Sequence, residues 1–103
     1  MLNYKYIIVD RDGVINHDSP AYIKSPQEWI PIKRSLEAIG LLTKHSYRIL
    51  LVSNQAGVSR GIIKYEDLIQ IHNKFISNCL EHGGKIFSTH YCYDHPDSNS
   101  TKR

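Results

Sequence analysis

The sequence has few of the features that mark secreted, membrane-bound or repetitive proteins. Its 103 residues include two cysteines, one methionine and one tryptophan. It shows no signal-peptide pattern, no apolar stretch long enough to cross a membrane, and no repeat or low-complexity tract. These absences predict a cytoplasmic protein without a membrane partner, in which Cys79 and Cys92 are free thiols and not a disulfide.

The chain also lacks a strong charge of one sign. Thirteen Lys and Arg against ten Asp and Glu give a net charge of +3, and the basic residues are scattered along the sequence. This gives no support for nucleic-acid binding, whereas a small anionic substrate would suit a mildly basic protein. The length suits one domain, residues 1–103, and is too short for two.

Apolar runs alternate with stretches of helical periodicity. The predicted strands lie at residues 6–9, 47–52 and 86–92. The predicted helices lie at residues 32–44 and 65–82, the first interrupted by Gly40 and the second with a poor cap at Lys64. The continuous run 6–9 is typical of a strand buried on both faces of a parallel sheet. The order predicts an α/β fold, a Rossmann-like parallel sheet with flanking helices.

Polar segments follow the predicted strands. Residues 11–31 contain three prolines and no sustained period, which indicates a long loop or flap, and residues 53–57 are typical of a polar turn. Because ligands of parallel sheets bind at the carboxyl ends of the strands, we expect Asp10, Ser53 and Cys92 along one edge.

Asp10 and Asp12 lie one residue apart at the end of the first predicted strand. One interpretation is a plain tight turn; a calcium loop is excluded because its later ligands are missing. The other is covalent phosphoryl transfer, with Asp10 as the nucleophile and Asp12 as the general acid and base. Two carboxylates so close together would favour one of them holding a proton, and a divalent cation would offset the remaining repulsion.

Several stretches resemble one enzyme family. DRDGVIN at residues 10–16 and SNQAGVSRG at residues 53–61 are similar to the first two motifs of haloacid dehalogenase superfamily phosphatases, in the subgroup that acts on heptose bisphosphate and histidinol phosphate. The flap at residues 18–26 and the segment at residues 28–31 also resemble the heptose branch. The similarity covers nearly the whole chain and implies a Mg²⁺-dependent phosphatase of carbohydrate metabolism, which makes heptose precursors of lipopolysaccharide.

The resemblance implies roles for individual residues. Asp10 would be the nucleophile and a magnesium ligand, and Asp12 would be the acid and base and bind magnesium through its backbone carbonyl. The residues implied in substrate binding are Asp18, Ser19, Tyr22, Ser53, Asn54, Gln55, Arg60 and Arg103. The family's phosphate-binding lysine would follow Arg103, and its later aspartate motif would complete the metal site. We therefore expect an N-terminal part of the domain that is inactive by itself and is unstable or associates.

Other readings stay open at this stage. Histidinol phosphate is the rival substrate, and a non-catalytic remnant is the rival to an enzyme. The full-length form is expected to be a monomer that acts on a small phosphorylated sugar. Zinc is not expected, because Asp94 stands where zinc-binding relatives have a histidine, His95 is one residue late, and no cysteine follows Cys92.

Overall fold

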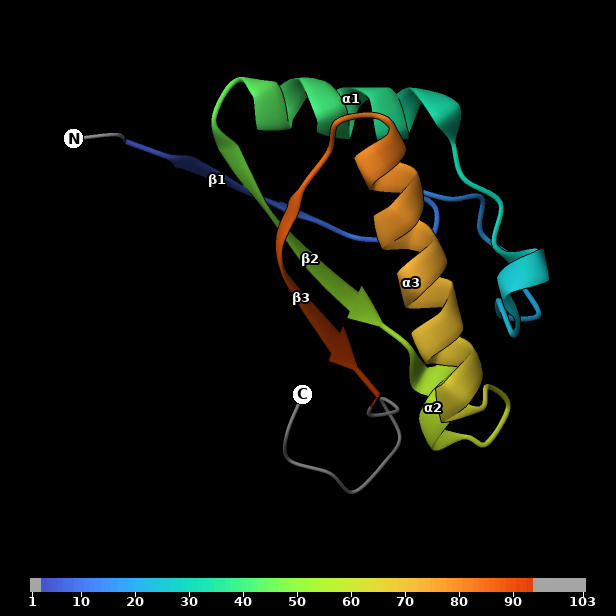
Figure 1. Ribbon diagram of the computed structural model, residues 1–103. Helices are drawn as coiled ribbons and strands as arrows, with labels where there is room; N and C mark the ends of the chain where they lie inside the picture. Colours follow the sequence, from blue (N-terminus) through green and yellow to red (C-terminus); the bar gives the residue numbers. More distant parts are fainter. Residues whose placement is uncertain (1–2, 94–103) are drawn as a thin grey trace.

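A parallel sheet with strand order β1–β2–β3 forms the centre of the fold (Figure 1). The structure, a computed structural model, describes residues 3–93. The strands are β1 (Lys5–Val9), β2 (Tyr47–Asn54) and β3 (Ile86–Cys92), and both neighbouring pairs run parallel. The long helices α1 (Lys33–Lys44) and α3 (Tyr65–Glu81) connect them. The predicted α/β fold with a parallel sheet and flanking helices is confirmed.

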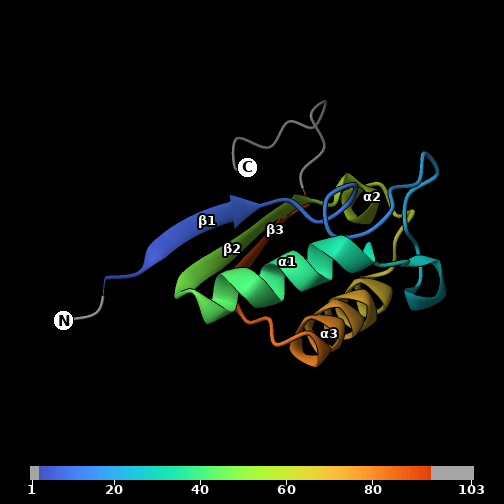
Figure 2. The same cartoon turned by 90° about the horizontal axis from the view of Figure 1, so that it is seen from above.

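Both long helices cover the same face of the sheet (Figure 2). The core between them and the sheet is apolar and contains Leu36, Ile39, Ile49, Leu51, Ile71, Phe75 and Cys79. Trp29, from the loop before α1, is fully buried, and its ring centroid lies 6.1 Å from that of Phe75. Burial of these side chains is the main source of stability.

The two glycines of the helix contact are there for close packing. A β-carbon on Gly40 would clash with the backbone carbonyl of His82, and one on Gly84 would lie 2.6 Å from Ile39 Cγ2. The glycine that weakens α1 locally therefore lets α1 approach the end of α3. As predicted, the first turn of α3 lacks a side-chain cap at Lys64. Among residues 3–93, no helix combines the length and apolar character of a membrane span.

The opposite face of the sheet is open, which corrects the prediction for the first strand. Tyr6 and Ile8 project from β1 on this face and are 57% and 69% exposed. Val52 of β2 and Phe87 of β3 are also exposed. The apolar run of β1 is therefore buried on one face, because no element among residues 3–93 covers the other (Figure 2).

The end of β2 also differs from the prediction. Ser53 and Asn54, predicted as part of a turn, continue β2 because they pair with Tyr91 and Cys92 of β3. The Gln55 backbone N–H extends this ladder by donating to the Cys92 carbonyl at 2.7 Å. The rest of the predicted turn is a short helix, α2 (Ala56–Ser59). The predicted flap is a loop apart from one 3₁₀ turn, η1 (Pro26–Glu28).

Candidate active site

Asp10 follows the last residue of β1, at the edge of the sheet where all three strands end. Its side chain is exposed, and Oδ1 accepts a hydrogen bond from the Arg11 backbone N–H at 2.7 Å. This bond orients the Asp10 carboxylate at the start of the loop, and the carboxylate remains exposed to solvent. The group has the access that a nucleophile or metal ligand requires.

Asp12 is held far more tightly than Asp10. Its carboxylate accepts four hydrogen bonds, from Arg11 Nε at 2.8 Å, Arg11 Nη2 at 3.3 Å, Asn16 Nδ2 at 3.1 Å and Gln55 Nε2 at 2.9 Å. Arg11 itself is fully buried. Such a charge-assisted, bidentate contact fixes both the position and the orientation of the carboxylate.

The surroundings of Asp12 favour the ionised form of its carboxyl. Burial raises the pKa of this carboxyl, but the hydrogen bonds and charge of Arg11, with the bonds from Gln55 and Asn16, outweigh burial and lower the pKa below its ordinary value. The buried guanidinium of Arg11 stabilises the ionised form of Asp12. The sequence interpretation counted the two carboxylates and left Arg11 out.

Gln55 links the ends of β1 and β2. Its amide Nε2 donates to Asp12 Oδ2 and also lies 3.0 Å from Ser53 Oγ, to which it donates. Ser53 is buried and Asn54 is exposed, because successive residues of β2 face opposite sides of the sheet. The three predicted substrate-binding residues of this segment therefore lie in different environments, and Gln55 contacts both Ser53 and the predicted acid.

The flap brings further predicted site residues together. The Arg60 Nη1 donates to the Tyr22 hydroxyl at 2.6 Å, joining the flap to the end of α2. Tyr22 has a φ of 67°, which is uncommon for a residue with a side chain and is a conformation enriched at functional sites. A β-carbon on Gly57 would lie 3.0 Å from the Tyr22 ring, so the glycine makes room for it.

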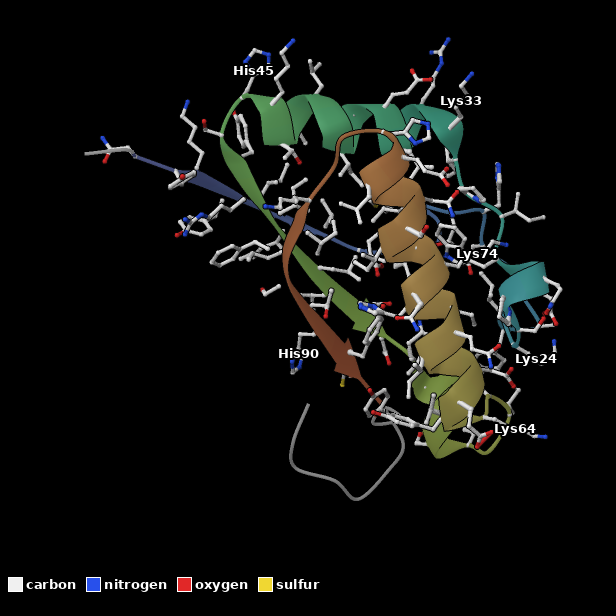
Figure 3. All side chains as sticks on the ribbon, viewed as in Figure 1. Lys24, Lys33, His45, Lys64, Lys74 and His90 are labelled. Atoms are coloured by element: carbon white, nitrogen blue, oxygen red, sulfur yellow. The ribbon has the colours of Figure 1, made fainter. Side chains whose placement is uncertain are left out.

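Asp18 and Ser19 lie nearer the aspartate loop. A β-carbon on Gly13 would be 3.8 Å from that of Asp18. Asp18 therefore lies against the loop that follows Asp12. The Ser19 N–H donates to Asp18 Oδ1 at 2.8 Å. At the other end of the flap, Lys74 reaches from α3 (Figure 3) and donates to the carbonyls of Pro26 and Trp29 at 2.6 and 2.8 Å.

Sequence reasoning missed three residues behind Asp12. The Arg11 Cζ lies 5.7 Å from the centre of the Tyr91 ring, and the Tyr91 hydroxyl is hydrogen-bonded to His72 Nδ1 at 2.7 Å. Burial, and then the charge of Arg11, lower the pKa of His72; burial raises the pKa of Tyr91. The usable signal was Arg11 itself, because it continues the alternation of the partly buried Ile7 and Val9 and should therefore point to the same side of the sheet.

Some predicted residues cannot be placed. Arg103, Asp94 and His95 lie outside the described residues. Among residues 3–93, His, Cys, Asp and Glu side chains do not gather in any group of three or more. Of the histidines named in Figure 3, His45 follows the end of α1, and His90 projects from β3 near the carboxyl end of that strand.

Comparison with known proteins gives a consistent result. The chain is 40% identical over 99 residues to D-glycero-β-D-manno-heptose-1,7-bisphosphate 7-phosphatase of Bordetella bronchiseptica, covering 96% of this chain and 55% of the relative. It is 41% identical over 93 residues to the enzyme of the same name from Pseudomonas putida, covering 90% of this chain and 53% of that one. The chain thus spans about half the length of the curated relatives it matches. No protein-family model matches it.

The structural comparison agrees. The crystal structure of D,D-heptose 1,7-bisphosphate phosphatase from B. bronchiseptica, complexed with magnesium and phosphate, superposes with a TM-score of 0.91 over 96% of this chain and 55% of that chain. In sequence and in fold, nearly the whole of this chain is similar to about half of these phosphatases. More closely, the chain is a homologue of the D-glycero-D-manno-heptose-1,7-bisphosphate 7-phosphatases, corresponding to about half of their length. The resemblance predicted from the two motifs is confirmed.

Proposed function

We propose that the domain to which this chain contributes is a Mg²⁺-dependent phosphatase for a sugar bisphosphate, D-glycero-D-manno-heptose 1,7-bisphosphate. The observation that carries the proposal is the aspartate loop: an accessible Asp10 at the end of β1 and an Asp12 fixed by Arg11 and Gln55. The relatives that align with nearly the whole of this sequence are phosphatases of this substrate by name. A cytoplasmic location belongs to the same proposal, because Cys79 and Cys92 are free thiols.

The chain's own residues suit a two-step displacement. An oxygen of the Asp10 carboxylate attacks phosphorus, the bond from phosphorus to the sugar oxygen breaks, and an aspartyl-phosphate forms. Asp12 in its acid form gives its proton to the departing alkoxide, then takes one from the water that attacks the aspartyl-phosphate and releases inorganic phosphate. Arg11 favours the ionised form of Asp12. For Asp12 to act as the acid, the negative charge of the bound substrate would have to raise the pKa of this carboxyl.

The residues present fit a magnesium ion as part of its ligand set. Asp10 offers an exposed carboxylate and Asp12 would offer its backbone carbonyl, and Mg²⁺ takes one or two protein carboxylates together with water and substrate phosphate. Bound there, the ion would neutralise charge on the phosphoryl oxygens. Asp18, Ser19, Tyr22 and Arg60, with the end of β2, would surround the sugar phosphate, and Arg103 would add a positive charge.

The test needs a complete domain. We define the complementary segment as the part of the B. bronchiseptica relative outside the aligned region, and the completed domain as this chain joined to that segment by a flexible linker. The completed domain should release phosphate from the heptose bisphosphate with Mg²⁺, and Asp10→Asn should abolish the release. Asp12→Asn should lower it by roughly 10²–10⁴-fold.

Asp67→Asn is the matched control, because Asp67 lies in the first turn of α3 and has no part in the proposed mechanism. It should leave turnover within about twofold, which corresponds to about 0.4 kcal/mol. Turnover by Asp10→Asn at the unmodified rate would remove Asp10 as the nucleophile. Faster turnover of histidinol phosphate than of the heptose bisphosphate would replace the substrate, and no turnover of either would leave a non-catalytic homologue.

A further inference from the structure

Hydrogen bonds fix only part of the Arg11 guanidinium that holds Asp12. Its Nε and Nη2 donate to the Asp12 carboxylate at 2.8 and 3.3 Å. Its third nitrogen, Nη1, is buried and has no hydrogen-bond partner among residues 3–93. The centre of the Tyr91 ring lies 5.7 Å from Arg11 Cζ, within the range of cation–π attraction. The ring therefore supports a guanidinium that hydrogen bonds alone do not fix.

Tyr91 is in turn held by His72. The hydroxyl of Tyr91, from β3, and Nδ1 of His72, from α3, are 2.7 Å apart, and the two rings meet edge to face with centroids 5.5 Å apart. A tyrosine that is packed along its ring and hydrogen-bonded at its tip has little freedom about its side-chain torsions. Residues from α3 and β3 together therefore fix the ring against which Arg11 lies.

The charge of His72 suits this position. Burial, and then the charge of Arg11, lower the pKa of His72, so the neutral ring is favoured. A neutral imidazole can accept a hydrogen bond from the Tyr91 hydroxyl at Nδ1, and it adds no second positive charge beside Arg11. Arg11 therefore meets no repulsion from His72 while it binds Asp12.

We propose that Tyr91 and His72 are positioning residues for the phosphatase reaction. His72 fixes the Tyr91 ring, the ring supports the Arg11 guanidinium, and Arg11 holds the Asp12 carboxylate where it gives and takes protons. The role of Asp12 as the acid and base rests on the proposed function. Because Tyr91 and His72 act through Arg11 on proton transfer and not on substrate binding, their loss should lower kcat and leave KM nearly unchanged.

The Tyr91 hydroxyl is tested with a matched pair of variants of the completed domain. Tyr91→Phe keeps the ring and removes the hydrogen bond to His72, so it should lower kcat for the heptose bisphosphate by about tenfold, with KM within about twofold. Tyr47→Phe is the control, because Tyr47 is also a half-buried strand tyrosine but begins β2, at the opposite end of the sheet from Asp12. Equal kcat values for the two variants would overturn the role of Tyr91.

Two substitutions of His72 separate its hydrogen bond from its bulk. His72→Asn places an amide close to the position of Nδ1 and keeps a hydrogen-bond partner for Tyr91, whereas His72→Leu leaves the hydroxyl without one. His72→Leu should lower kcat about as much as Tyr91→Phe, and His72→Asn should recover most of the loss. Equal losses in both variants would show that only the packing of His72 matters and would overturn its positioning role.

A second measurement tests the contact without catalysis. Urea unfolding of the 103-residue chain is followed by the fluorescence of Trp29, the single tryptophan, which is buried. It gives the equilibrium constant of unfolding for Tyr91→Phe, Asp12→Asn and the double variant. Because both residues contact Arg11, the effect of the double variant should differ from the product of the single effects by about fivefold or more. The same cycle with Tyr47→Phe should be multiplicative within about twofold.

The two measurements separate the positioning role from the proposed function. An unmodified completed domain that releases no phosphate would contradict the proposed function, and coupling between Tyr91 and Asp12 in the chain would still establish the support of Arg11. Independent effects of Tyr91→Phe and Asp12→Asn on unfolding would overturn the path through Arg11, even if kcat fell.

Discussion

The two faces of the sheet have similar side chains and very different environments. On the face covered by α1 and α3, Ile49 and Leu51 of β2 are fully buried. On the open face, Ile8 and Val52 are equally apolar and are 69% and 44% exposed. Alternation along a strand normally pairs an apolar face with a polar one when one side meets solvent. Over the described residues, the open face is therefore as apolar as the covered face, although no helix lies across it.

One alanine substitution on each face of the sheet should show the largest difference in the free energy of unfolding. Ile49→Ala removes a buried side chain from β2 and should lower the free energy of unfolding by about 2–5 kcal/mol. Ile8→Ala removes an exposed one from β1 and should lower it by about 1 kcal/mol or less. Urea unfolding followed by Trp29 fluorescence measures both, and similar losses would show that the open face is already covered.

Substitutions of the two aspartates should also lower the free energy of unfolding by different amounts in the same assay, and the difference should be almost as large as that between Ile49→Ala and Ile8→Ala. Asp12→Asn leaves the fully buried Arg11 without its carboxylate and should cost about 3 kcal/mol of unfolding free energy. Asp10→Asn alters an exposed group and should stay within about 0.5 kcal/mol. A small effect at Asp12 would mean that Arg11 has another partner.

The pH dependence of Asp12 has a definite sign. Its pKa in the folded state is lowered from 3.8, so its contribution to stability is complete above that value and is lost as the pH falls through the lowered folded-state pKa. The Asp12→Asn variant should therefore lose less stability than the parent between about pH 4 and pH 2. Parallel pH curves for the two proteins would contradict the ion pair.

The two cysteines should differ in reactivity, because Cys79 lies in the core and Cys92 lies at the carboxyl edge of the sheet. Burial raises the pKa of the Cys79 thiol to about 12, so almost no thiolate forms at pH 8, whereas Cys92 at the end of β3 is half-buried. A thiol reagent at pH 8 should label Cys92 well before Cys79, and Cys79 should react only on unfolding. Mass spectrometry of digested protein gives the two rates, and equal rates would show that the α3 packing opens readily.

The smallest expected effect concerns the zinc content of the purified protein. Asp94 and the absent cysteines leave too few ligands for a closed tetrahedral site, so protein purified without chelators should contain far less than one zinc per chain. Elemental analysis measures the content. One zinc per chain would show that the segment after β3 forms a metal site.

Periodicity placed the regular elements well. The third strand was predicted at its observed bounds, and α1 and α3 begin or end within one residue of the prediction. Local pattern could not extend β2 through Ser53 and Asn54, because that depends on pairing with a strand over thirty residues away. It also missed α2, since four residues carry too little periodicity to be read as a helix.

The site was predicted as a set of residue types and not as a network. Asp10, Asp12 and Gln55 were named, but the decisive contacts run through Arg11, which a search for carboxylates passes over. The roles assigned to Tyr22 and Arg60 came from resemblance, and their mutual hydrogen bond comes from the folding of the flap against α2. The exposure of β1 could not be read from its apolar run, because burial depends on what lies across the sheet.

The most direct test of the account is phosphate release from D-glycero-D-manno-heptose 1,7-bisphosphate in Mg²⁺, measured on the 103-residue chain and on the completed domain, with sedimentation of each. The account predicts that the chain by itself is less stable than the completed domain or associates, and that it releases no phosphate. The completed domain should be a monomer that releases phosphate through Asp10. A cooperatively folded, monomeric 103-residue chain that hydrolyses the substrate would contradict it.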